Sequence, residues 1–207
     1  MVDLTLEQFA DRLRASIDSV TLTGSAFVPL YQSLGPAAVG MVKTHFVEGR
    51  APDGTPWAPL AHPRPDGSSV PLRDTGGLMA SITFKADADG LAVGTNHVAA
   101  KLHQAGGTVT PKKAKYLAIP LTKRAKRAGS PRSFGELAVR MRKGANKCVM
   151  VSVRGRGKGE AQYALVQSVT VPARPFVGFS AAEMDRLGQL AAAWVAKKLV
   201  VALTGAR

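Results

Sequence analysis

The side chains that most often carry out chemistry are few and widely spaced in this sequence. His97 and His103 are six residues apart, a spacing that does not place them on one helix face as a metal pair requires. No carboxylate lies between them, and His103 is better interpreted as a packed or hydrogen-bonded residue beside Gln104. Cys148 is the only cysteine, so no cysteine-based zinc cluster is expected. The sequence predicts no metal site.

Motifs for nucleophilic catalysis and nucleotide binding are incomplete. No serine lies in a Gly-x-Ser-x-Gly turn, and Cys148 falls in a predicted strand with no histidine near it in sequence. The glycine-rich run 155–159 lacks the Walker spacing and the final Lys-Ser/Thr pair of a phosphate-binding loop. The carboxylates are too scattered to form a catalytic pair. We therefore expect no enzymatic activity, no catalytic residue and no bound cofactor.

Positive charge is the strongest feature of the composition, with a net charge of +14. Residues 101–174 contain 17 Lys and Arg against two acids, a net of +15, and the remaining residues contain 11 against 12, a net of −1. A field of this sign favours nucleic acid, an acidic protein face or another anionic surface. The candidate contacts with a partner or a neighbouring subunit are Trp57, Arg124, Lys126, Arg127, Arg142, Arg154, Arg156 and Lys158.

Nucleic acid is one of the partners that this charge could serve. Residues 101–174 of this chain contain enough Lys and Arg to contact successive phosphates of a nucleic-acid backbone. However, Tyr116, Phe134 and Tyr163 are well separated, so no platform for stacking single-stranded bases is evident. No zinc-finger or RNA-recognition motif is present. The sequence leaves three alternatives for the basic residues: they bind duplex DNA, they bind an acidic protein, or they form a solvated surface.

The length and composition of the chain predict one domain over residues 1–207. No apolar run reaches the length of a membrane span, so no membrane partner is expected. Asp3 and Glu7 interrupt any secretion signal, and synthesis in the cytoplasm is the expectation.

Helices are predicted at both ends of the chain. Residues 5–20 combine a capping-box spacing with an apolar stripe at intervals of three and four. A second helix is predicted over residues 25–47, with an interruption near Pro36 because proline is tolerated mainly in a first helical turn. The last helix begins after Ser180, which forms a capping box with Glu183, and its apolar face is expected to meet the core or another subunit.

A turn-rich arm and a hairpin separate these helices in the sequence. Residues 49–71 contain six prolines and two Asp-Gly turns, with Trp57 as an apolar anchor. Residues 82–84 and 91–93 are predicted strands joined by a tight turn. A short helix and a glycine pair follow, where the chain can turn sharply.

The basic segment 108–171 is predicted to be rich in β-structure. Residues 116–121 suggest a strand, residues 134–141 a short amphipathic helix, and residues 148–154 and 161–171 a hairpin with a glycine-rich tip. The expected fold class is therefore α+β: an antiparallel sheet packed with N- and C-terminal helices, with a basic β-rich insertion after the glycine pair.

Several short motifs recur in an order that is specific as a whole. They occupy residues 49–60, 72–82, 93–95, 103–107 and 172–178. The candidate structural residues within them are Asp53, Gly54, Thr75, Gly76, His103, Gln104, Gly106, Gly107, Arg174, Pro175 and Phe176. In this order the motifs resemble the phage virion morphogenesis family, the tail-completion and head–tail joining proteins of Mu-like tailed phages. Ala99-Ala100 stands where that family usually has a tyrosine, and the stretch 110–170 is longer than in its compact members.

The resemblance implies a non-enzymatic structural protein that completes the tail or joins it to the head. It implies a ring of copies of this chain, expected to be a hexamer and held by contacts that close by rotation. The implied partners are the tail tube and the head connector or neck proteins, with packaged DNA as a candidate contact. The protein would be made in the host cytoplasm and located in the neck or tail of the virion. The alternatives are a basic DNA-binding protein of a phage or prophage and an assembly helper absent from the particle.

Overall fold

The structure is a computed structural model that describes residues 27–61, 64, 67–134, 137–141, 148–152 and 159–204. The predicted helix at residues 5–20 lies outside the described residues, as does most of the glycine-rich run 155–159. Contacts divide the chain into two compact units. Unit 1 comprises Met1–Thr55, Gly77–His97 and Phe176–Arg207, and unit 2 comprises Pro56–Gly76 and Val98–Pro175.

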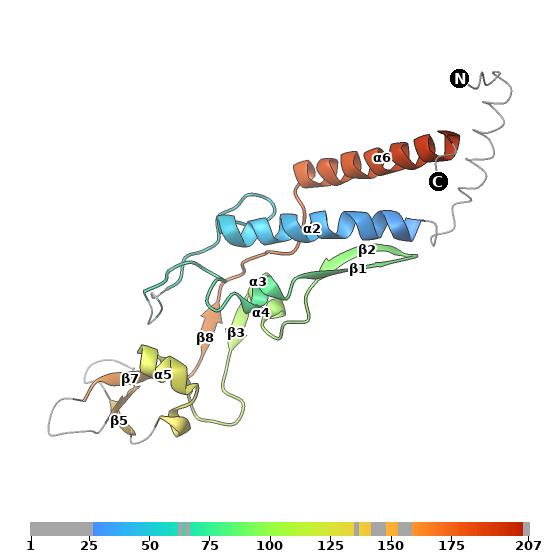
Figure 1. Cartoon of the computed structure of the whole chain (residues 1–207). Helices are drawn as coiled ribbons and strands as arrows, with labels where there is room; N and C mark the ends of the chain where they lie inside the picture. The colour runs from blue at the N-terminus through green and yellow to red at the C-terminus, as the bar shows by residue number, and fades with distance from the viewer. Residues whose placement is uncertain are drawn as a thin grey trace. The chain divides into compact units, whose positions relative to one another are not determined.

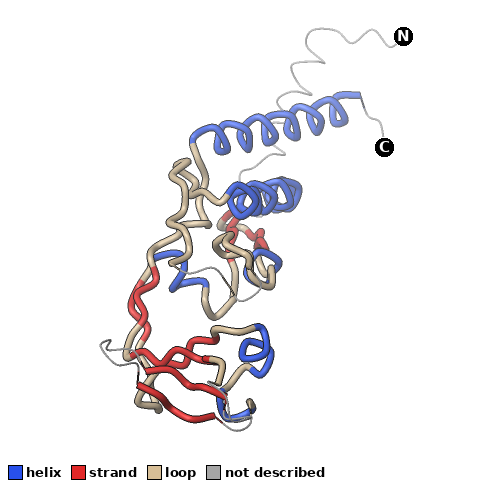
Figure 2. Tube along the Cα trace, turned by 90° about the vertical axis from the view of Figure 1, so that its left-hand side faces the viewer, coloured by secondary structure: helices blue, strands red, loops and turns tan. Residues whose placement is uncertain are grey.

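The fold is α+β, as the sequence predicts, and the strands within the described residues all pair antiparallel. In unit 1 the helix α2 (Val28–Glu48) contacts both the helix α6 (Ala181–Thr204) and the hairpin of strands β1 (Thr83–Asp87) and β2 (Gly90–Gly94). Figures 1 and 2 show α2 as the middle layer of these three. The short helix α3 (Gly77–Ala80) precedes the hairpin. The long helices thus hold unit 1 together.

The helix α2 continues through Pro36, so the predicted interruption there is wrong. A proline inside a helix costs about 3 kcal/mol because it removes one hydrogen bond and crowds the preceding turn. The side of α2 opposite this loss is well packed: Ala38, Val42 and Phe46 are completely buried. Burial of a valine or phenylalanine side chain contributes roughly 1.5–3 kcal/mol, so the packing of Val42 and Phe46 offsets the cost of the proline.

The predicted hairpin is confirmed and is longer than its sequence pattern suggests. Strand β1 (Thr83–Asp87) pairs with β2 (Gly90–Gly94) in register from Thr83↔Gly94 to Asp87↔Gly90. The backbone N–H of Asp89 donates to Oδ1 of Asp87 at 3.1 Å, which fastens the tight turn.

Unit 2 contains the helix α4 (Ala100–Ala105) and two sheets. One sheet pairs β3 (Gly107–Val109) with β8 (Val169–Val171). The other has the order β4–β7–β6–β5, and its strands are β4 (Leu117–Pro120), β5 (Leu137–Met141), β6 (Cys148–Ser152) and β7 (Ala161–Val166). The predicted pairing of the second hairpin is confirmed in β6 and β7. Its second strand is divided, however, because β8 leaves this sheet to pair with β3.

The helix α5 (Lys123–Ala128) contacts β4 and β7 of the four-stranded sheet, and a 3-10 turn, η2 (Pro131–Ser133), follows it. Phe134 and Tyr163 meet edge to face, with ring centroids 5.8 Å apart, and pack with Ala125 in the core of the sheet. The predicted helix at residues 134–141 is wrong, since Leu137–Met141 is the strand β5. Its apolar residues satisfy either period, and pairing with β6 decides for the strand.

None of the helices in the described part of the chain combines the length and the apolar character needed to cross a membrane.

Candidate functional site

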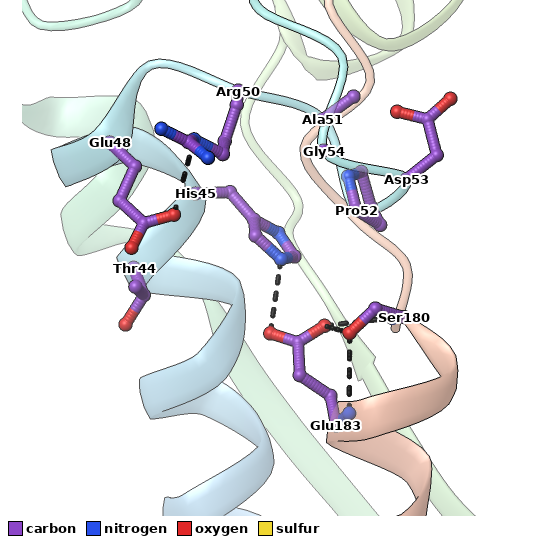
Figure 3. A pocket seen from close by; sticks show the side chains of 10 residues that line it. All are labelled: Thr44, His45, Glu48, Arg50, Ala51, Pro52, Asp53, Gly54, Ser180 and Glu183. Atoms are coloured by element: carbon purple, nitrogen blue, oxygen red, sulfur yellow. Dashed lines mark hydrogen bonds and ion pairs between the residues drawn. The ribbon is translucent and has the colours of Figure 1, made fainter.

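A polar pocket of about 340 Å³ lies in unit 1 where α2 ends and α6 begins. Figure 3 shows its lining, which includes His45 and Glu48 from α2, Arg50 and Asp53 from the chain after it, and Glu183 from α6. Gly49 ends α2 in the left-handed conformation and donates its N–H to the carbonyl oxygen of His45. The pocket thus results from the way in which two helix termini meet.

His45 and Glu183 form the most buried polar pair of this pocket. Nδ1 of His45 lies 3.0 Å from the carbonyl oxygen of Phe176, and Nε2 lies 3.1 Å from Oε1 of Glu183. Both ring nitrogens therefore lie within hydrogen-bond distance of an oxygen atom. His45 is 5 % exposed, so this pair is held inside unit 1.

Glu183 also forms the predicted capping box of α6. Its Oε2 accepts hydrogen bonds from the backbone N–H and the hydroxyl of Ser180, at 2.8 and 2.9 Å. The N–H of Glu183 donates back to the Ser180 hydroxyl oxygen at 3.2 Å. Burial by itself would raise the pKa of Glu183, but the hydrogen bonds from Ser180 and the nearby His45 hold that pKa below its usual value.

The three side chains do not have the geometry of a nucleophilic triad. Such a triad needs the histidine to accept the serine proton, yet the hydroxyl of Ser180 donates to Glu183 and both nitrogens of His45 are used elsewhere. Among the described residues no group of three His, Cys, Asp or Glu side chains is placed to hold a metal ion. What the arrangement can do is join α2, α6 and the chain at Phe176.

Arg174 is the centre of a second polar cluster, in unit 2. It is 4 % exposed, and its guanidinium donates to the carbonyl oxygens of Ala58 and Pro59 at 2.8 and 3.0 Å. Burial, and after it the charge of Arg64, lower the pKa of Arg174, although a guanidinium stays protonated in proteins. The backbone N–H of Arg174 donates to the carbonyl oxygen of His103 at 2.7 Å. Arg174 therefore joins the proline-rich arm to α4.

Trp57 completes the attachment of the arm. Its indole N–H donates to the carbonyl oxygen of Pro175 at 2.8 Å, and its side chain is 6 % exposed. Contact of Trp57 with a partner stays a prediction, but in this chain the side chain serves as the internal anchor that the arm requires. Gly106 has a φ of 71°, and a Cβ there would lie 2.7 Å from the backbone nitrogen of Ala173. Only glycine allows this close approach.

The other candidate structural residues lie in turns and junctions. Gly54 and Gly76 have positive φ angles, Gly107 follows Gly106 at the start of β3, and Gln104 is half-buried on α4. Oδ1 of Asp53 accepts the backbone N–H of Thr55 at 2.9 Å, which is the first reason why the pKa of Asp53 is lowered. Thr75 is exposed. Phe176 is buried against Phe46 in unit 1, with ring centroids 5.1 Å apart.

The basic candidates that the structure describes all lie on α5. Arg124 lies over the ring of Phe134, 4.7 Å from its centroid, Lys126 is paired with Asp74, and Arg127 is exposed. Arg142, Arg154, Arg156 and Lys158 lie outside the described residues. Unit 2 contains 19 Lys and Arg against four Asp and Glu, a net of +15, while unit 1 contains nine against ten, a net of −1. The charge boundary seen in the sequence thus coincides with the division into units.

The pair of His45 and Glu183 is the feature that sequence reasoning missed. The capping box identifies Glu183, but no local signal connects it with a histidine 138 residues earlier. The one indication that His45 could pair with a distant residue was its buried position on the apolar side of its helix.

These clusters belong to an α+β fold in which buried polar groups join segments that are distant in sequence. Comparison with known protein families gives a match to the phage virion morphogenesis family over residues 5–196. The chain belongs to this family. Neither the curated proteins nor the solved structures that were compared include a match.

Proposed function

We propose that this chain is a non-enzymatic structural protein of the phage neck or tail, which completes the tail or joins it to the head as a ring of copies. The observation that carries the proposal is the family match over residues 5–196, which assigns the chain to virion morphogenesis. The hydroxyl of Ser180 donates to Glu183, so this pocket holds no serine that is activated by a base. Tail tube and head connector or neck proteins are the proposed partners.

The helix α6 supports the proposal of a ring. It packs on α2, yet Leu190 and Val201, which are eleven residues apart and therefore lie on the same side of the helix, remain 41 and 42 % exposed. Apolar side chains in a row along one helix favour a protein contact over solvent. We propose that this side of α6 contacts a neighbouring subunit. A heterologous contact of this kind closes into a ring when the rotation between subunits allows it.

Two measurements test the proposal. Mass spectrometry of purified virions should find the chain in the particle, and light scattering after size exclusion should find an oligomer, with a hexamer as the expected stoichiometry. An assembly helper would be absent from the particle. A chain that is monomeric at every concentration and absent from virions would refute the proposed function.

A charge on α6 tests the subunit contact directly. Leu190→Glu should dissociate the oligomer, because loss of one apolar contact of this size weakens association by roughly 1.5–3 kcal/mol before the cost of burying a charge is added. Gln189→Glu is the matched control: it adds the same charge at an exposed, already polar position one residue away. Equal oligomeric states for both variants would exclude this side of α6. Circular dichroism should show that both variants keep the helix content of the wild type.

A further inference from the structure

The outward side of α5 in unit 2 carries only positive charge. Ala125 is completely buried and Ala128 packs against the same core, so the four other residues of the helix point outward. These are Lys123, Arg124, Lys126 and Arg127. Tyr163 fixes the helix in this orientation, because its hydroxyl donates to the carbonyl oxygen of Ala125 at 3.0 Å.

Little of this charge is neutralised within the described part of unit 2. In this part of unit 2, the ion pairs are those of Asp74 with Arg64 and with Lys126. The carboxylate of Glu160 accepts a hydrogen bond from Gln162. Most of the other cationic side chains that the structure describes in unit 2 are exposed, namely Arg73, Lys101, Lys112, Lys113, Lys115, Lys123, Arg124, Arg127, Arg132 and Arg140. Such a surface repels itself unless an anion covers it.

We propose that the α5 face of unit 2, defined as Lys123, Arg124 and Arg127, binds the phosphate backbone of duplex DNA. A protein interface normally has an apolar centre from which charged residues are depleted. The outward side of α5 has no apolar residue at all, so it fits a regular row of phosphates better than an acidic protein. This inference does not rest on the proposed function, since it follows from the charge and orientation of α5.

Duplex is favoured over single-stranded nucleic acid by the aromatic residues of unit 2. Binding of single strands uses exposed aromatic rings on which successive bases stack. Phe134 and Tyr163 are 8 and 1 % exposed, and Trp57 is 6 % exposed. The ring of Tyr116 is half-buried and has the ammonium of Lys115 5.6 Å from its centroid. The described residues of unit 2 thus offer charge without a stacking surface, and binding should be independent of base sequence.

The test is fluorescence anisotropy of a labelled 20-base-pair duplex titrated with the full chain between 50 and 200 mM salt. Each neutralised phosphate contributes about −0.9 to the slope of log K against log salt. Lys123→Ala with Arg127→Ala should therefore reduce the steepness of the slope by about 1.8 and weaken binding about 60-fold at 0.1 M salt. Arg124 is left in place because it lies over Phe134 in the core.

The matched control removes two exposed cations from unit 1, with Lys85→Ala and Lys197→Ala. It changes the net charge equally and should leave the slope unchanged. Equal losses in both double variants would mean that net charge alone drives binding, and would overturn the assignment to α5. Failure of the wild type to bind duplex at 50 mM salt would also overturn it. So would tighter binding to a single-stranded oligonucleotide or to polyglutamate, which would indicate a stacking surface or an acidic protein partner. Circular dichroism and thermal melting of each variant keep loss of folding separate from loss of binding.

Discussion

Replacement of Glu183 by glutamine tests whether the polar cluster of unit 1 acts through charge. The carboxylate accepts hydrogen bonds on both oxygens, from Ser180 on one side and from His45 on the other. Glutamine has the same shape but only one acceptor oxygen. Its NH₂ group must therefore face either the donors of Ser180 or the N–H of His45, and one set of donors loses its acceptor.

The expected cost of Glu183→Gln is about 2 kcal/mol of unfolding free energy at pH 7. A hydrogen bond to a charged group contributes about 1.5–3 kcal/mol. Loss of a capping interaction adds about 1 kcal/mol, but glutamine retains part of a capping box. The side chain of Glu183 is 20 % exposed, so water offsets some of the loss. These contributions together lead to the estimate of about 2 kcal/mol.

The effect should depend on pH in a defined direction. The pKa of Glu183 is lower in the folded protein than its usual value of 4.5, because of Ser180 and His45 acting against burial. The ionised carboxylate thus stabilises the fold at any pH above the unfolded pKa, and this stabilisation is lost as the pH falls through the folded pKa. The difference between wild type and Glu183→Gln should therefore be full at pH 6–7 and should shrink below about pH 4.5.

Urea unfolding followed by tryptophan emission can measure this difference within unit 1. The two tryptophans lie in different units, Trp57 in unit 2 and Trp194 in unit 1. In a Trp57→Phe background the signal of Trp194 reports on α6, which contains Glu183. The matched control is Glu48→Gln, which lines the same pocket and forms an exposed pair with Arg50 at 3.4 Å. That variant should cost at most about 0.5 kcal/mol.

A loss at Glu183 that stays constant from pH 7 to pH 3 would refute this reasoning, because it would show an effect of packing and not of charge. A loss no larger than that of Glu48→Gln would refute it as well, since the buried pair would then contribute no more than an exposed one.

Three further substitutions have predictable effects on the free energy of unfolding, measured by urea unfolding with Trp194 emission for unit 1 and with Trp57 emission in a Trp194→Phe background for unit 2. Gly35→Ala should destabilise unit 1 by about 2 kcal/mol or more, because its Cβ would lie 2.3 Å from the ring of Phe84. The Cβ of Gly40→Ala, on the same helix, would meet no atom within 4 Å, so this substitution should stabilise unit 1 by about 0.5–1 kcal/mol. If Gly35→Ala and Gly40→Ala changed the unfolding free energy in the same direction, the packing described for α2 would be wrong. Arg174→Lys should destabilise unit 2 by about 1–3 kcal/mol, because one ammonium does not reproduce the two guanidinium bonds to Ala58 and Pro59; full stability of Arg174→Lys would show that charge alone suffices there.

Local chemistry made several parts of the structure predictable. The capping box at Ser180 depends on a spacing of three residues, and the hairpin β1–β2 on alternating strands joined by a two-residue turn. The sharp turn at Gly106-Gly107 was predicted because a glycine pair allows backbone angles that other residues avoid, and Gly106 has a φ of 71°. The division of charge also coincides with the two units, although charge does not direct folding.

The incorrect predictions have a common physical cause. Pro36 is a poor helix residue, and Leu137–Met141 can follow a helical or a strand period. In both places the outcome depends on burial and pairing with distant segments, which outweigh local preference. The pattern of a single sequence does not show whether burial and pairing with distant segments outweigh the local preference.

By itself the sequence determined the α+β class, the basic character of unit 2, the cap of α6 and the order of motifs typical of the family. Only the tertiary structure decided which polar groups meet: Glu183 with a histidine 138 residues away, and Arg174 with a carbonyl group 116 residues away. Spacing along a chain specifies contacts within a turn or a hairpin, because the backbone geometry there is nearly fixed. Contacts across more than a hundred residues depend on how whole elements pack, and here that packing creates both polar clusters.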